Sequence, residues 1–184
     1  MNLHHPDHAG EVIARKRINR APLPALAIGL PWATIMLASM ASFSPVISSA
    51  PVMPPLAYMM LLAWRMMRPG MLPLWAGLPL GLFDDLYSGM PFGSGIVLWS
   101  GTMLAMELID EKFLWRGFVQ DWLAASALIA AYLVLASLVA GLATGYPLPL
   151  VILPQTLVSV VLYPVVSRLV ALLDRVRLLP LKRL

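Results

Sequence analysis

Six apolar runs make up most of this 184-residue chain, and their lengths limit what it can fold into. The first, 22–42, would rise about 31 Å as an α-helix, enough to cross a hydrocarbon core of ~30 Å. Inside lipid, backbone polar groups must be satisfied within the segment, so such runs form helices. We therefore predict an all-α integral membrane protein with six transmembrane helices, at 22–42, 56–67, 71–87, 92–109, 122–144 and 150–173.

Basic residues occur in only every second connection between these runs. Connections on the cytoplasmic side of a membrane carry an excess of Lys and Arg. The three connections near 43–51, 88–91 and 144–149 contain neither residue. All 13 Lys and Arg residues would therefore lie on one face, which predicts a multi-pass membrane protein with both termini cytoplasmic; the resemblance described below implies that the membrane is the bacterial inner membrane. They fall within 15–20, 65–68, 112–116 and 168–183.

This map divides the chain into a basic cytoplasmic tail at 1–20, a membrane domain at 21–174 and a basic C-terminal tail at 175–184. Such tails are topology signals, and they can also hold anionic lipid head groups or a soluble partner. The linker 110–121 mixes charged and aromatic residues, which favours an amphipathic stretch at the interface. Pro154 and Pro164 are expected to kink the last helix without ending it.

The composition indicates that lipid surrounds the chain, and it includes few side chains of the kinds that catalyse reactions. The chain is 60% hydrophobic and 12% charged, against roughly 25% charged residues in soluble domains. It has no cysteine, and no histidine follows His8. His4, His5 and His8 lie in a polar tail with one nearby acid, so we expect no metal site there. We predict no enzyme, no cofactor and no nucleic-acid partner.

The most unusual stretch is GLFDDLYSGMPFG at 81–93, which places Asp84 and Asp85 at the end of an apolar run. An Asp at the centre of a span costs roughly 2.5 to 3.5 kcal/mol on insertion scales, so such a residue suggests a functional site. Adjacent helical side chains point about 100° apart, which predicts one carboxylate facing inward and the other facing the interface. Both would also oppose the helix dipole.

Several partners could explain these acids. A Lys or Arg on the same side is excluded by the charge map. A bound cation, a residue of another protein, or hydroxyl groups such as Ser88, Ser94 and Thr102 remain. The structural alternative is that Asp85 holds the turn at 88–91, as Asp often does beside Gly and Pro.

The residues Gly81, Asp85, Ser88, Gly89, Pro91 and Gly93 follow the order G-x-x-x-D-x-x-S-G-x-P-x-G. Together with the preceding Arg65, Arg68 and Pro69, this pattern resembles the MreD family of rod shape-determining membrane proteins. The resemblance covers about 56–107, and the length and six-span plan agree elsewhere. Asp84 departs from it, because the family has an apolar residue at that position.

The resemblance implies a non-enzymatic component of the bacterial cell-elongation complex, which organises peptidoglycan synthesis and cell shape. It implies a fold similar to the substrate-binding subunits of energy-coupling-factor transporters. The implied partners are an MreC-like single-span membrane protein and, with it, MreB, RodA and the elongation penicillin-binding protein. Asp85 would brace the corner between two helices, and the corner glycines would permit close helix approach. Those glycines are Gly89, Gly93, Gly95 and Gly101.

Two other classes of function compete with this one. The related fold allows a small-molecule binding subunit of a membrane transporter, which would need a polar pocket opening toward the outer side. An intramembrane enzyme would need helpers for the two carboxylates, and the remaining acid of the apolar runs, Glu107, is predicted near the opposite face.

Overall fold

The structure, a computed structural model, describes residues 24–41, 53–112, 117–145 and 152–177. All regular secondary structure in these ranges is helical, which confirms the predicted all-α class. The N-terminal tail with its histidines, the C-terminal tail beyond 177 and most of three loops lie outside the described residues. The helices are α1 Pro24–Ala41, α2 Leu56–Met67, η1 Leu74–Ala76, α3 Gly77–Ser88, α4 Ser94–Lys112, α5 Phe118–Thr144 and α6 Ile152–Arg177.

Helix α2 has the predicted bounds, whereas the region before α3 differs from the prediction. Gly70 has a φ of 87°, and Pro73 is extended, so the chain turns here and forms the short helix η1 before α3 begins. A proline that lacks an N–H and disfavours helix in the preceding residue explains the late start. The third helix is therefore shorter than the predicted run at 71–87.

The predicted interfacial stretch at 110–121 is largely absorbed into the two neighbouring helices. Helix α4 continues to Lys112, and α5 begins at Phe118. Gly117 is extended, and its N–H donates to the Gln120 side chain at 2.9 Å, which fixes the start of α5. Residues 113–116 lie outside the described residues, so the amphipathic stretch at the interface stays a prediction.

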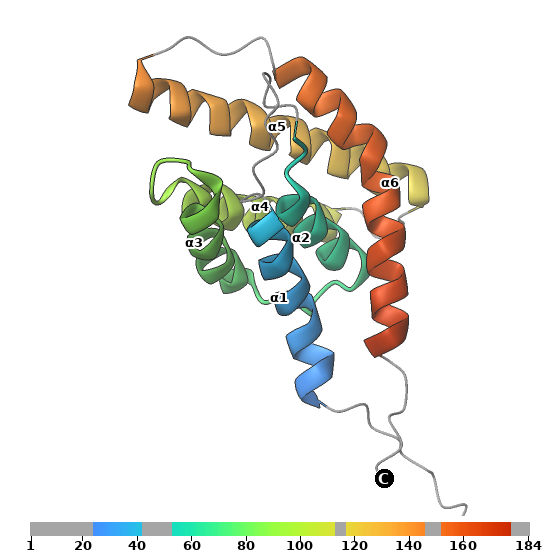
Figure 1. The fold of residues 1–184 in the computed structure, drawn as a ribbon. Helices are drawn as coiled ribbons and strands as arrows, with labels where there is room; N and C mark the ends of the chain where they lie inside the picture. The colour runs from blue at the N-terminus through green and yellow to red at the C-terminus, as the bar shows by residue number, and fades with distance from the viewer. Residues whose placement is uncertain (1–23, 42–52, 113–116, 146–151, 178–184) are drawn as a thin grey trace, which may run out of the picture.

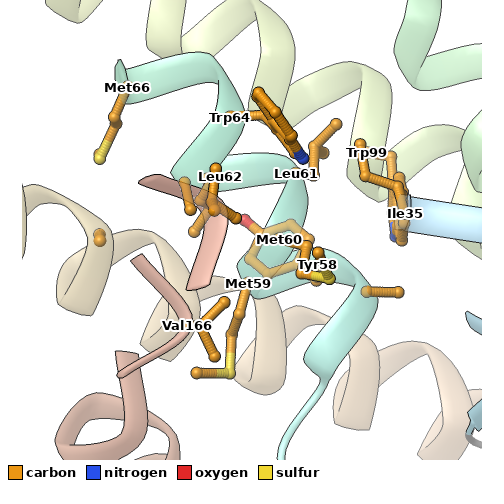
Figure 2. Packing of buried hydrophobic residues seen from close by; sticks show 14 of the residues in the cluster. Ile35, Tyr58, Met59, Met60, Leu61, Leu62, Trp64, Met66, Trp99 and Val166 are labelled. Atoms are coloured by element: carbon orange, nitrogen blue, oxygen red, sulfur yellow. The ribbon is translucent and has the colours of Figure 1, made fainter. Parts of the chain in front are cut away.

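Helix α2 forms the centre of the molecule. Ten of its residues, from Ala57 to Met66, are buried, and the helix contacts α1, α5 and α6 (Figure 1). Figure 2 shows its side chains in the middle of the apolar cluster, surrounded by Ile35 of α1, Trp99 of α4 and Val166 of α6. A helix that is apolar all round must be enclosed by others, which is the position that α2 occupies.

Two of the described helices are long and apolar enough to cross a membrane, namely α5 over Phe118–Ala143 and α6 over Ile152–Val176. Both expose many large apolar side chains along their length. Figure 1 shows α5 crossing α6 at a steep angle, and it shows the start of α1 and the end of α6 on the same side of the molecule. These features agree with a membrane protein; α1 and α2 are apolar but shorter.

Ion pairs join the C-terminal ends of three helices. Arg65 of α2 contacts Glu107 of α4, and its guanidinium lies 3.3 Å from Asp110. Arg68, at the end of α2, lies 2.9 Å from Asp174 of α6. We call this set the charged end. Glu107 therefore belongs to the charged end, where the sequence placed it.

Candidate functional site: an acidic elbow and the cavity beside it

The connection between α3 and α4 is a tight corner built on glycine, and we call residues 84–95 the elbow. Gly89 ends α3 with a φ of 67°, and Gly93 has a φ of 95° just before α4. Glycine occupies this left-handed region without the steric cost of a Cβ atom. The Ser88 hydroxyl accepts a hydrogen bond from the Met90 N–H at 3.4 Å, so Ser88 holds the turn itself.

Asp85 closes the elbow by binding the start of α4. Its Oδ2 accepts the Gly93 N–H at 2.8 Å, and its Oδ1 accepts the Gly95 N–H at 2.7 Å and the Ser94 hydroxyl at 3.3 Å. These N–H groups have no partner within the helix, and the positive end of the helix dipole favours an anion there. Asp85 thus acts on α4 rather than on the turn at 88–91, and the unfavourable dipole of α3 is offset by that of α4.

Asp84 does not contact the start of α4, and it is not turned toward the membrane interface either. The exposed fractions of Asp84 and Asp85 are 6% and 7%. The prediction that one of them turns outward was wrong, because α3 is covered on more than one side. Asp84 lies beside the buried Ser39 of α1 and near Tyr132 of α5. The offset of about 100° between neighbours directs the two carboxylates to different helices.

Close approach between α3 and α4 depends on a different set of glycines from the one predicted. A Cβ atom on Gly81 would lie 2.4 Å from the Gly95 carbonyl oxygen, and one on Gly77 would lie 2.8 Å from the Ser100 Cα atom. A Cβ atom on Gly95 would lie 2.7 Å from Asp85 Oδ1, so the cap also requires glycine there. The prediction holds for Gly95 and was wrong for three positions with no such neighbours, which are Gly89, Gly93 and Gly101.

A cavity of about 390 Å³ lies between α2, α3, α5 and α6, beside the elbow. Asp84 and Ser88 line it from α3, Tyr58 from α2, Tyr132 from α5 and Gln155 from α6. It begins at the N-terminal end of α2, and so lies away from the charged end. Sequence reasoning missed the tyrosines and Gln155, because they come from three separate helices and share no spacing that would group them.

The aromatic side of this cavity is held in place by hydrogen bonds and ring contacts. The rings of Tyr58 and Tyr132 are stacked with centroids 4.0 Å apart. The Tyr58 hydroxyl forms a hydrogen bond with the Thr102 hydroxyl at 2.9 Å, and it donates to the Leu128 carbonyl at 3.3 Å. Thr102 was predicted as a partner for the acids, but it serves Tyr58 instead. The cavity wall is therefore rigid at this point.

Among the described residues, no group of three or more His, Asp or Glu side chains could hold a metal ion. Ion pairs within the same residues use Arg65 and Arg68 as cations, and neither pairs with Asp84 or Asp85. The described residues therefore offer two features: a helix corner braced by Asp85, and a cavity whose wall includes the carboxylate of Asp84. No protein-family model, curated protein or solved structure matches the chain.

Proposed function

We propose that this chain is a six-span protein of the bacterial inner membrane and a non-enzymatic component of the cell-elongation complex, in the manner of the MreD family. On this proposal it binds an MreC-like single-span protein and, with that partner, helps to organise peptidoglycan synthesis by RodA and the elongation penicillin-binding protein above MreB. Two features support it: the apolar surfaces of α5 and α6, and the separation of the charged end from an elbow without basic residues.

The observation that carries the proposal is the elbow braced by Asp85. Three hydrogen bonds from α4 fix the corner, and the contact of Gly81 with Gly95 brings the two helices together. Beside this rigid corner, Leu86 and Phe92 are exposed. Small-residue packing and apolar surface are what transmembrane helices use to associate in lipid. A single-span helix could therefore dock here without rearranging the corner.

Site-specific photocrosslinking in growing cells tests this docking role. A photoreactive residue at Phe92 should capture one single-span membrane protein. The same residue at Val161 of α6 is the matched control, because Phe92 and Val161 are equally exposed at 73%. Equal capture from both positions, or capture of no single-span protein from Phe92, would remove the support for a scaffold at the elbow.

The six-span topology has its own test. The chain has no cysteine, so single cysteines can be introduced without background labelling. Pro69→Cys near the charged end and Met90→Cys in the elbow should react with a membrane-impermeant maleimide from opposite sides. Met90→Cys should label in intact cells whose outer membrane has been permeabilised, and Pro69→Cys only after the inner membrane is opened. Labelling of both from the same side would contradict the proposed arrangement.

The second candidate function is a small-molecule binding subunit of a membrane transporter, and the cavity beside the elbow favours it. Binding sites for small molecules usually measure 300–1,000 Å³, have mostly apolar walls and contain a few converging polar groups. The cavity of about 390 Å³, with Asp84, Ser88 and Gln155 on its walls, has these properties. The elbow and the cavity share Asp84, Ser88 and Met90, but Asp85, which braces the corner, is not among the residues that line the cavity.

A further inference from the structure

The cavity beside the elbow has one carboxylate and no cation to neutralise it. Among the described residues that line it, Asp84 is the only acid, and none of them is a Lys, Arg or His. We propose that the cavity binds a small organic cation, a protonated amine with an apolar body, through the carboxylate of Asp84. This inference deepens the second candidate function, on which it rests, and is independent of the scaffold role.

Asp84 and Asp85 are adjacent, but only Asp84 can serve a ligand. Both oxygens of Asp85 accept hydrogen bonds from the start of α4. Asp84 has no such set of N–H donors; its neighbours are the Ser39 hydroxyl and the Tyr132 ring. A carboxylate that is 6% exposed and faces a cavity is costly unless it is paired or neutral. A bound ammonium group supplies the missing pair.

The charges of the residues that line the cavity disfavour other classes of ligand. An anion would meet Asp84 without a basic residue to hold it. A hard divalent cation would need several oxygen ligands, and the described residues offer no group of three acids or histidines. A neutral ligand would leave Asp84 unpaired. An ammonium group needs a single carboxylate and a few acceptors, which Ser88 and the Gln155 amide oxygen can supply.

The remaining walls suit an apolar and preferably flat body. The stacked rings of Tyr58 and Tyr132 lie on one side. Aromatic faces attract cations by about 0.5 to 2 kcal/mol at suitable distances, so tyrosines near a carboxylate favour an ammonium over a neutral group. Leu133, Ala136 and Ile152 add apolar surface. The cavity therefore combines charge recognition at Asp84 with apolar contacts around it.

Isothermal titration calorimetry on the purified full chain in a nonionic detergent tests the inference. The probes are benzylammonium, which is protonated at neutral pH, and benzyl alcohol, a neutral analogue of similar shape. The native chain should bind benzylammonium at least about tenfold more tightly than benzyl alcohol. Asp84→Asn should remove that preference. Glu107→Gln, which removes a carboxylate at the charged end, should leave it unchanged.

A second variant guards against misfolding of Asp84→Asn. Ala136→Leu keeps Asp84 and fills the cavity, so it should lose binding of both probes. A preference for benzylammonium that survives in Asp84→Asn overturns the inference. So does benzylammonium binding that survives in Ala136→Leu, or the absence of saturable binding to the native chain. Equal binding of the two probes to the native chain, lost in Ala136→Leu, overturns the cation class and leaves the small-molecule pocket of the second candidate function standing.

Discussion

Both ends of this molecule bury charge, but they compensate it by different means. At the charged end, acids of α4 and α6 are paired with Arg65 and Arg68. At the elbow, Asp85 is paired with the N–H groups of a helix start. An ion pair needs two side chains from distant segments, whereas a helix terminus supplies its partial charge from the backbone. The elbow can therefore bury an acid that none of the ion pairs among the described residues reaches.

The largest loss of unfolding free energy should come from a substitution at the charged end. Arg65 is buried and faces two acids, so Arg65→Leu would remove the guanidinium that Glu107 and Asp110 both contact. Removing one partner of a buried ion pair typically costs 3–5 kcal/mol, and the partial exposure of these acids places the expected loss at about 3 kcal/mol. Denaturant titration in micelles should measure it, with the neighbouring Met66→Leu as the volume-matched control. A loss below about 1 kcal/mol would show that the acids are adequately solvated.

The next effect should come from the contact between α3 and α4. Gly81→Ala places a Cβ atom 2.4 Å from the Gly95 carbonyl oxygen, a backbone atom that cannot move aside cheaply. The helices must separate, at an expected cost of about 2–3 kcal/mol. Gly101→Ala is the control, since nothing lies near its Cβ position and alanine favours helix by up to about 1 kcal/mol. A melting temperature that rises in both variants would contradict this contact.

Replacing each of the two adjacent acids of the elbow by alanine should change the free energy of unfolding by different amounts. Asp85→Ala leaves the N–H groups of Gly93 and Gly95 without their acceptor, and the expected loss of unfolding free energy is about 2 kcal/mol. Asp84→Ala removes a buried carboxylate that, among the described residues, accepts no backbone N–H and has only the Ser39 hydroxyl beside it, so the chain should keep or gain stability. The same denaturant titration compares the two, and an equal loss in both would contradict the separate roles.

The smallest effect should come from the more exposed ion pair. The Arg68 side chain is 47% exposed and its partner Asp174 is 9% exposed, so solvent reaches the pair from the arginine side, and its contribution should lie near the roughly 0–1 kcal/mol of exposed pairs. Arg68→Leu should cost about 1 kcal/mol or less, and the loss should shrink as salt rises from low concentration to 0.5 M, because salt screens exposed charges. Asp85→Ala should show little salt dependence. If the loss of unfolding free energy in Arg68→Leu does not depend on salt, the Arg68 ion pair is not screened by solvent as predicted.

The sequence was sufficient for features that repeat along the chain. The helical class and the bounds of α2 follow from apolar runs, and the pairing of Arg65 with Glu107 agrees with the predicted grouping of charge. Which helix faces another does not follow from such runs. Apolar all-round helices have no polar face to indicate orientation, so the burial of both Asp84 and Asp85 could not be read from their 100° offset alone.

In the candidate site, too, the sequence indicated which residues matter, but not which helices they contact. The spacing from Asp85 to Gly93 and Gly95 was visible in the sequence, although the acceptor role toward α4 required the geometry of the corner. The sequence pattern included Gly81 but not its role in helix packing, since that role depends on the backbone of α4 opposite it. The cavity residues Tyr58 and Tyr132 are 74 positions apart in the numbering, and only packing brings their rings together.

The elbow also has a consequence for the order in which the protein is made. Asp85 bonds to residues only eight and ten positions later, whereas Arg68 must wait for Asp174, 106 positions along the chain. Synthesis runs from the N-terminus, and contacts between near neighbours close first. The hairpin of α3 and α4 can thus be complete in the nascent chain before α5 and α6 are translated, and those later helices meet a preformed surface.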